Sequence, residues 1–185
     1  MAKQSGFSLV ELTTTLAIIG IISAALIAVM NNLNTQSEQM NSQTELLAGG
    51  RQLFALVEPW AALAGHKQAN PNLSQNKAYE IVSSSHVKFC YDLDSASRQQ
   101  REFRLRDRKL QERVEDNSSC TVTPNENGWV DVSEPIIRSL TFSDSEGSDY
   151  SLDMRLELEK NVPGTSEITT SIMRRRFNLF AMTIY

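Results

Sequence analysis

The chain has 185 residues and a formal net charge of −4 at neutral pH. This length accommodates one membrane segment and one modest domain with a single core. The mild acidity argues against nucleic acid as an obligatory partner, because phosphate backbones attract basic surfaces.

A long uncharged run follows the N-terminus: no ionisable side chain lies between Glu11 and Glu38. At a rise of about 1.5 Å per residue, a helix over residues 7–30 crosses the roughly 30 Å hydrocarbon core of a bilayer. The hydroxyls of Thr13 to Thr15 are tolerated there, since they bond back to carbonyls one turn earlier. A carboxylate at the edge of such a helix is costly, which makes Glu11 a functional-site candidate with an expected partner. Lys3, alone before the helix, indicates a cytoplasmic N-terminus.

The stretch from Gly6 to Leu12, GFSLVEL, resembles the processing motif of type IV prepilins and type II secretion pseudopilins. The resemblance implies that residues 1–6 are a leader, and that prepilin peptidase cuts between Gly6 and Phe7 and methylates the new Phe7 amine. It also implies that Glu11 meets the Phe7 ammonium in the filament, where pairing is favoured over two unpaired charges. The alternatives are an uncleaved signal anchor, with Glu11 among the headgroups, or a signal peptide cut near Ala28.

The helix is predicted to continue over residues 31–64. Apolar residues recur there every seven positions, flanked by further apolar side chains: Leu33, Met40, Leu47, Phe54 and Ala61. Such a stripe is typical of a helix whose outer half packs on a globular head. Too few heptads and flanking charges argue against a coiled coil. The pair Gly49-Gly50 marks a position where we expect a bend.

Residues 65–185 are predicted to form a β-rich domain, because the hydrophobic period changes to two. The expected strands are 87–93, 103–110, 129–132, 136–142, 152–158 and 168–185. One helix followed by several strands predicts an α+β fold with an antiparallel sheet. The pilin resemblance implies the same architecture.

Cys90 and Cys120 are the two cysteines of the chain. Two cysteines in an exported domain usually pair, and a disulfide across this separation is worth about 3 kcal/mol in the chain-entropy model. The alternative is two buried free thiols.

Several polar segments invite a functional interpretation. The basic residues of 98–113 suggest DNA capture, but interleaved acidic residues favour a solvated strand pair. Arg174 to Arg176 form either a contact to acidic groups of a neighbouring subunit or a plain exposed strand. Residues 144–149 have the composition of a calcium loop without EF-hand spacing, which favours a hairpin turn. His66 and His86 belong to no recognisable motif, so we predict no catalytic residue, no metal, no cofactor and no enzymatic activity.

The absence of proline from residues 25–30, and the 65 residues that follow Cys120, depart from the pattern of major pilins. Size, strand order and a basic last strand look more like a minor pilin of the W type or the J-type minor pseudopilin. The resemblance implies a structural subunit that initiates or caps a type IV pilus or a secretion pseudopilus.

Its implied partners are other pilin subunits, prepilin peptidase and the inner-membrane assembly platform. Its implied location is the inner membrane, crossed once, with a periplasmic C-terminal domain that later joins the filament. The competing function is a membrane-anchored extracytoplasmic module that binds DNA or a surface ligand.

Overall fold

The computed structural model describes residues 8–65, 79–92, 98–116, 127–134, 136–144 and 151–179. These residues form one long α-helix and eight strands in two antiparallel sheets, which confirms the predicted α+β class. The chain divides into two compact units, residues 1–41 and 42–185. The helix α1 (Leu9–Leu63) contributes to both.

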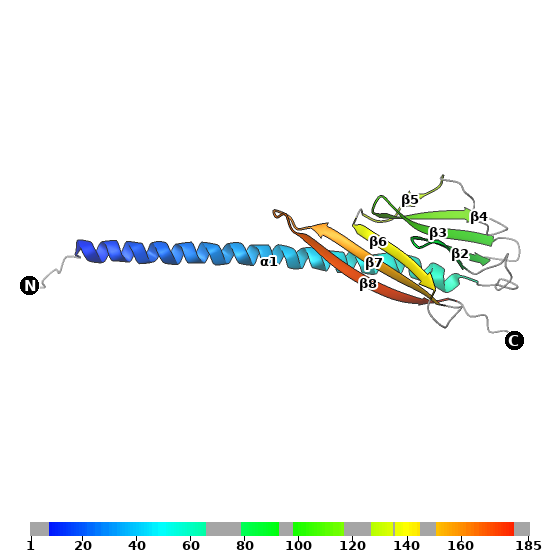
Figure 1. Ribbon diagram of the computed structural model, residues 1–185, viewed down its shortest axis with the longest axis horizontal. Coiled ribbons are helices and arrows are strands. Elements are labelled where there is room, and N and C mark those ends of the chain that lie inside the picture. The colour runs from blue at the N-terminus through cyan, green and yellow to red at the C-terminus, as the bar shows by residue number, and fades with distance from the viewer. Residues whose placement is uncertain are drawn as a thin grey trace, which may run out of the picture. The chain divides into compact units, whose positions relative to one another are not determined.

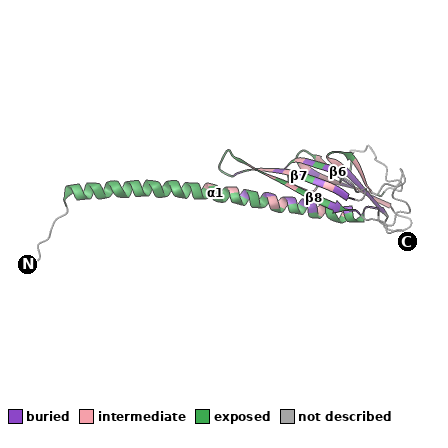
Figure 2. Cartoon of the chain, turned by 60° about the horizontal axis from the view of Figure 1, so that its bottom comes forward, coloured by how far each residue is buried: buried purple, intermediate pink, exposed green. Residues whose placement is uncertain are grey.

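In the first unit, α1 exposes its apolar side chains along its whole described length, as the green ribbon of Figure 2 shows. By length and composition, α1 is long and apolar enough to cross a membrane. Leu33 and Met40, which the seven-residue pattern predicted to be on a packed face, are 57% and 69% exposed. The predicted stripe is therefore wrong in this part of the helix.

In the second unit, α1 presents one buried face. Apart from the adjacent pair Leu53 and Phe54, its buried residues recur every three or four positions: Ser42, Leu46, Gly50, Leu53, Phe54, Val57 and Ala61. This spacing places them on a single face of a 3.6-residue helix. The helix continues through Gly49-Gly50, and the two glycines lie close to the side chains of Ile136 and Met173. The bend expected there stays a prediction.

The strands of the second unit follow one another in space in the order of the sequence (Figure 1). The five-stranded sheet contains β1 (Tyr79–Ser83), β2 (His86–Asp92), β3 (Arg98–Arg106), β4 (Lys109–Asp116) and β5 (Val130–Asp131). The three-stranded sheet contains β6 (Ile137–Asp144), β7 (Ser151–Asn161) and β8 (Ile168–Asn178). Strand β6 contacts β1, β2 and β3 of the larger sheet.

The core of the second unit lies between the buried face of α1 and the inner faces of both sheets. Val87, Phe89 and Phe103 line the five-stranded sheet, and Phe142 and Phe177 line the other. On β7 the alternation predicted from the sequence is confirmed, because its apolar residues are all buried: Leu152, Met154, Leu156 and Leu158. Phe54 of α1 meets Phe177 of β8 edge-on at 6.3 Å between ring centroids.

The predicted strand 103–110 is in fact parts of two strands. A two-residue turn at Asp107 and Arg108, with φ of 51° and 65°, reverses the chain between β3 and β4. Both residues adopt the left-handed conformation that a tight hairpin of this kind requires. The sequence has no glycine there, so the usual signal for the turn is missing. The predicted last strand ends at Asn178, and residues 180–185 lie outside the described residues.

Replacing Gly50 with alanine is expected to destabilise the second unit. An added Cβ would overlap the Met173 Sδ and lie 3.0 Å from Leu158 Cδ1, which is fully buried. Overpacking costs about 1–3 kcal/mol, against a gain of about 1 kcal/mol in helix propensity. We expect a net loss of about 1 kcal/mol in denaturant unfolding of the detergent-solubilised chain. Gly20→Ala, whose Cβ meets nothing within 4 Å, should cause no such loss.

Candidate functional site

Glu11 lies at the beginning of α1, and its carboxylate bonds to the end of its own helix. Ser8 is the residue that precedes the helix, and its backbone N–H donates to Glu11 Oε2 at 3.0 Å. The Ser8 hydroxyl in turn accepts from the backbone N–H of Val10 at 3.4 Å. A serine before the first turn and a glutamate three residues later form a capping box, in which each side chain satisfies a backbone donor.

This arrangement accounts for a carboxylate at the edge of an apolar helix. The first N–H groups of a helix have no intrahelical acceptor, and in lipid each unpaired group costs several kcal/mol. Glu11 supplies an acceptor for one of them, and its negative charge lies at the positive end of the helix dipole. Gly6 and Phe7 lie outside the described residues, so the predicted pair of Glu11 with the Phe7 amine stays a prediction.

The three threonines that follow Glu11 bond back to the helix backbone, as the sequence predicts. Thr13 and Thr14 donate to the Val10 carbonyl, both at 3.0 Å, and Thr15 donates to the Glu11 carbonyl at 2.7 Å. Their hydroxyl groups are therefore satisfied without water, which suits a helix that meets lipid or other helices.

A second cluster of polar side chains lies in the five-stranded sheet around Glu102 of β3. Glu102 accepts hydrogen bonds from His86 Nε2 and from the Arg113 guanidinium, each at 2.7 Å, and from the Gln100 amide. Glu102 pairs with Arg113 across the β3–β4 ladder. The carboxylate and the guanidinium are only 1% and 2% exposed. Residues 98–113 were predicted to form a solvated strand pair. This prediction is wrong for Glu102 and Arg113, whose side chains are buried.

The indole of Trp129 packs against this cluster. The Arg104 guanidinium lies 3.9 Å from the centre of the Trp129 ring, that of Arg113 lies at 4.9 Å, and the His86 ring meets it edge-on. Guanidinium groups over an indole face are attracted by the ring quadrupole. Burial raises the pKa of Glu102, but the hydrogen bonds and charges of His86 and Arg113 outweigh burial and hold the pKa below its usual value. The carboxylate is therefore a structural anion.

Other basic residues also pair with carboxylates of this chain. Arg101 pairs with Glu112 and lies 3.5 Å from the Trp60 ring centre. In the basic run of β8, Arg175 bonds to Glu58 at 2.7 Å. Arg176 bonds to Asp153 through two nitrogens, at 2.8 and 3.1 Å. These cations are dispersed among internal partners, which does not favour either basic segment as a nucleic-acid surface.

Cys90 lies in β2 and is fully buried, and the part of the chain that the structure describes contains no free thiol. Cys120, His66 and residues 145–150 lie outside the described residues. The predicted disulfide and the predicted hairpin at 144–149 therefore stay predictions. Within the described ranges, no three His, Cys, Asp or Glu side chains are grouped as a metal site would require.

Residues 1–27 match the family model of the prokaryotic N-terminal methylation motif. Comparisons with curated proteins and with solved structures each gave no match. The motif supports a type IV pilin-like class of protein, and with the apolar part of α1 it fits membrane anchoring. The matched segment contains the capping box of Ser8 and Glu11, whereas the β-rich unit lies beyond it.

Proposed function

We propose that the chain is a pilin-type structural subunit. Prepilin peptidase removes residues 1–6 and methylates the Phe7 amine, and the mature chain assembles into a type IV pilus or a type II secretion pseudopilus. The observation that carries this proposal is the methylation motif over residues 1–27, continuous with the apolar part of α1.

The exposed apolar surface of α1 supports the two stages of this function. Its large aliphatic side chains are more than half exposed, among them Leu16, Ile21 and Leu26. Lipid covers such a surface while residues 7–30 anchor the chain once in the inner membrane, with residues 65–185 in the periplasm. In the filament the helices of other subunits replace the lipid, so transfer from membrane to filament keeps the surface away from water. The assembly platform of the inner membrane is the partner that carries out this transfer.

Glu11 has a separate role in each stage. Before cleavage its carboxylate completes the capping box with Ser8. Cleavage creates an ammonium group on Phe7, the residue next to Ser8, and pairing with it neutralises both charges within the helix bundle. The pair also sets the axial register of neighbouring subunits, because a mismatch leaves both charges unpaired.

More specifically, we propose that the chain is a minor pilin of the W type or the J-type minor pseudopilin, which initiates or caps the filament. It rests on chain size, on the strand order and on the basic last strand, β8. A disulfide between Cys90 and Cys120 belongs to the same proposal, and the burial of Cys90 together with a periplasmic location supports it. We assign the chain a structural and not an enzymatic role.

Intact-mass analysis of the chain, produced with and without a prepilin peptidase, tests the proposed function. We expect the peptidase to remove residues 1–6 and to add one methyl group to Phe7. A catalytically inactive peptidase should leave the chain at full mass. A chain that stays unprocessed with the active enzyme, or that is cut beyond Ala28, contradicts the proposal and leaves an anchored or secreted domain.

A further inference from the structure

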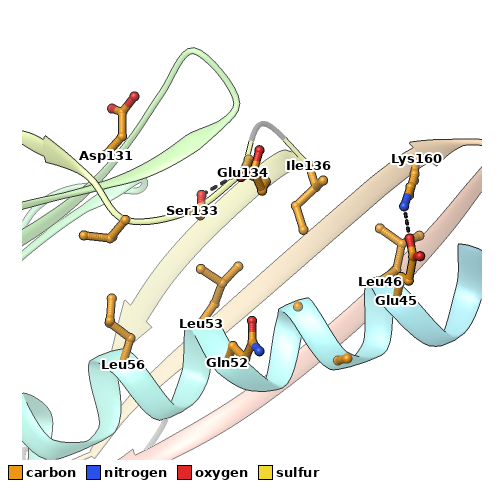
Figure 3. A pocket seen from close by; sticks show the side chains of 13 residues that line it. Glu45, Leu46, Gln52, Leu53, Leu56, Asp131, Ser133, Glu134, Ile136 and Lys160 are labelled. Carbon is orange, nitrogen blue, oxygen red and sulfur yellow. Dashed lines mark hydrogen bonds and ion pairs between the residues drawn. The ribbon is translucent and has the colours of Figure 1, made fainter.

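A half-open groove of about 720 Å³ lies within the second unit, between α1 and the segment that connects β5 to β6 (Figure 3). Its apolar lining comes from both sides: Leu46, Ala48, Gly49, Leu53, Leu56, Val132 and Ile136. The lining residues include three carboxylates, on Glu45, Asp131 and Glu134, and one ammonium, on Lys160.

Two of these carboxylates have cationic partners, and the third lies exposed beside the groove. Glu45 pairs with Lys160, as the dashed line in Figure 3 marks. Asp131 accepts from Lys109 at 2.8 Å. Glu134 is exposed, and its charge acts on Lys109, the same cation that is bonded to Asp131, so one ammonium serves two carboxylates. An occupant that presents apolar side chains and one cation therefore fits the groove.

Strand β8 presents a surface of this kind, which we call the β8 face: Ile168, Ile172 and Arg174. These residues are separated by even intervals, so they lie on one side of the strand. Ile168 and Ile172 are 57% and 58% exposed, and Arg174 is exposed. The alternate residues Met173 and Phe177 point to the core. Since no second strand pairs with the outer edge of β8 in the described part of the sheet, the β8 face borders an open edge.

The groove and the β8 face lie on opposite sides of the three-stranded sheet, because Lys160, which lines the groove, shares the side of the buried residues of β7, whereas Ile168 and Ile172 are on the exposed side. A Cβ on Gly49 would meet Ile136 beside the groove, whereas one on Gly50 would meet Met173 of β8. In the three-stranded sheet β6, which follows Ile136, and β8 occupy opposite edges. A single molecule therefore cannot place its own β8 face in its own groove.

We propose that the groove takes up the β8 face of a second copy of this chain. Ile168 and Ile172 are about 13 Å apart, at a rise of about 3.3 Å per residue along the strand. The helical wall of the groove, from Glu45 to Leu56, is about 16 Å long, so it is long enough to contact both side chains. Ile168 and Ile172 then cover the leucines of the groove, and the Arg174 guanidinium pairs with the Glu134 carboxylate.

Such a contact joins two different surfaces, so it is heterologous and leaves a free groove at one end and a free β8 face at the other. Copies joined in this way form an open row, which is the geometry that a filament requires. The inference rests on the proposed function as a filament subunit and requires several copies of the chain in one filament, which a subunit that only caps the filament would not provide.

Site-specific photo-crosslinking of the full chain, in cells that contain its filament machinery, tests the contact. A photoreactive amino acid replaces Gln52, an exposed residue that lines the groove. We expect a crosslinked species of twice the chain mass, whose linked peptide contains residues 168–178. The same photoreactive residue at Ala55, exposed on α1 but outside the groove lining, should not give this species.

Charge reversal identifies the ion pair. Arg174→Glu places two carboxylates together and should reduce the dimer by about tenfold or more, and adding Glu134→Arg should restore it. Arg106→Glu, at the exposed end of β3, is the matched control and should leave the dimer unchanged. A dimer linked elsewhere, a link only to another protein, or no effect of Arg174→Glu overturns the inference. The mass of the N-terminus, measured in the same cells, shows whether the proposed function or the groove contact has failed. If the N-terminus is processed but no dimer forms, only the groove contact is contradicted.

Discussion

Glu11→Gln is expected to leave the chain processed and in the membrane, yet to reduce its incorporation into filaments by about a hundredfold or more. The substitution leaves the Phe7 ammonium without an anion inside an apolar helix bundle, and breaking a buried pair in this way costs about 3–5 kcal/mol. Each 1.4 kcal/mol corresponds to about a tenfold change in an equilibrium. The measurement compares the amount of chain in sheared filaments with the amount in membranes, and the mass of the N-terminus confirms processing.

Glutamine separates the two roles of Glu11, because its amide oxygen still accepts the Ser8 N–H in the capping box. Ser8→Ala provides the opposite change: it removes the hydroxyl that caps Val10 and keeps the carboxylate. Loss of this cap costs about 1 kcal/mol, so incorporation should fall far less than with Glu11→Gln. If Glu11→Gln filaments form at the normal level, the carboxylate acts only as a helix cap.

At the N-terminus, the sequence predicts the membrane helix and also carries a signal for where that helix starts. Charge and apolar length predicted a membrane helix, and the threonine hydroxyls bond as expected. The serine three residues before Glu11 is itself a helix-start signal. The expected partner of Glu11 was the Phe7 amine. The hydrogen bond from the Ser8 backbone N–H to the Glu11 carboxylate was not predicted.

In the β-rich unit, strands were predictable where one face is apolar and the other polar, as on β7. A period of two indicates which face of a strand is buried, but it does not indicate the neighbouring strand. The division into two sheets was therefore not predicted. The β3–β4 turn was missed because Asp107 and Arg108 adopt positive φ without the usual glycine.

The buried cluster around Glu102 was unpredictable for a related reason. Charged residues that alternate along a strand usually face solvent. Here the ladder places Arg113 beside Glu102, and Trp129, distant in sequence, packs against the cluster. Strand register and tertiary contacts set this environment, and neither is encoded in a local pattern.

Arg113→Met is expected to lower the free energy of unfolding of the second unit by about 3–5 kcal/mol, because it leaves the buried Glu102 carboxylate without its guanidinium partner. Tryptophan fluorescence of the detergent-solubilised chain in denaturant measures the loss. Arg108→Met removes a half-exposed pair with Glu159 and should cost less than about 1 kcal/mol. The double variant Glu102→Leu with Arg113→Met removes both buried charges and should recover part of the loss. The recovery is incomplete because the Gln100 amide and the His86 ring lose their acceptor. If Arg113→Met costs no more than Arg108→Met, the cluster does not stabilise the fold.

The pH dependence of unfolding distinguishes a lost charge from lost packing. The folded state holds the pKa of Glu102 below the ordinary value of 4.5, so between these two values the unfolded chain binds more protons than the folded chain. The stabilisation is therefore complete above pH 4.5 and is lost as the pH falls through the folded-state pKa. Glu102→Gln should remove the part of the acid dependence that Glu102 causes. Asp131 and Asp153 also have lowered pKa values, but they contribute equally to the unaltered chain and to the Glu102→Gln variant. In Arg113→Met the folded-state pKa of Glu102 rises toward or beyond its unfolded value, so the loss of stability on acidification that Glu102 causes should shrink or reverse compared with the unaltered chain. Parallel pH profiles for the three chains would show that the cluster stabilises through packing and not through charge.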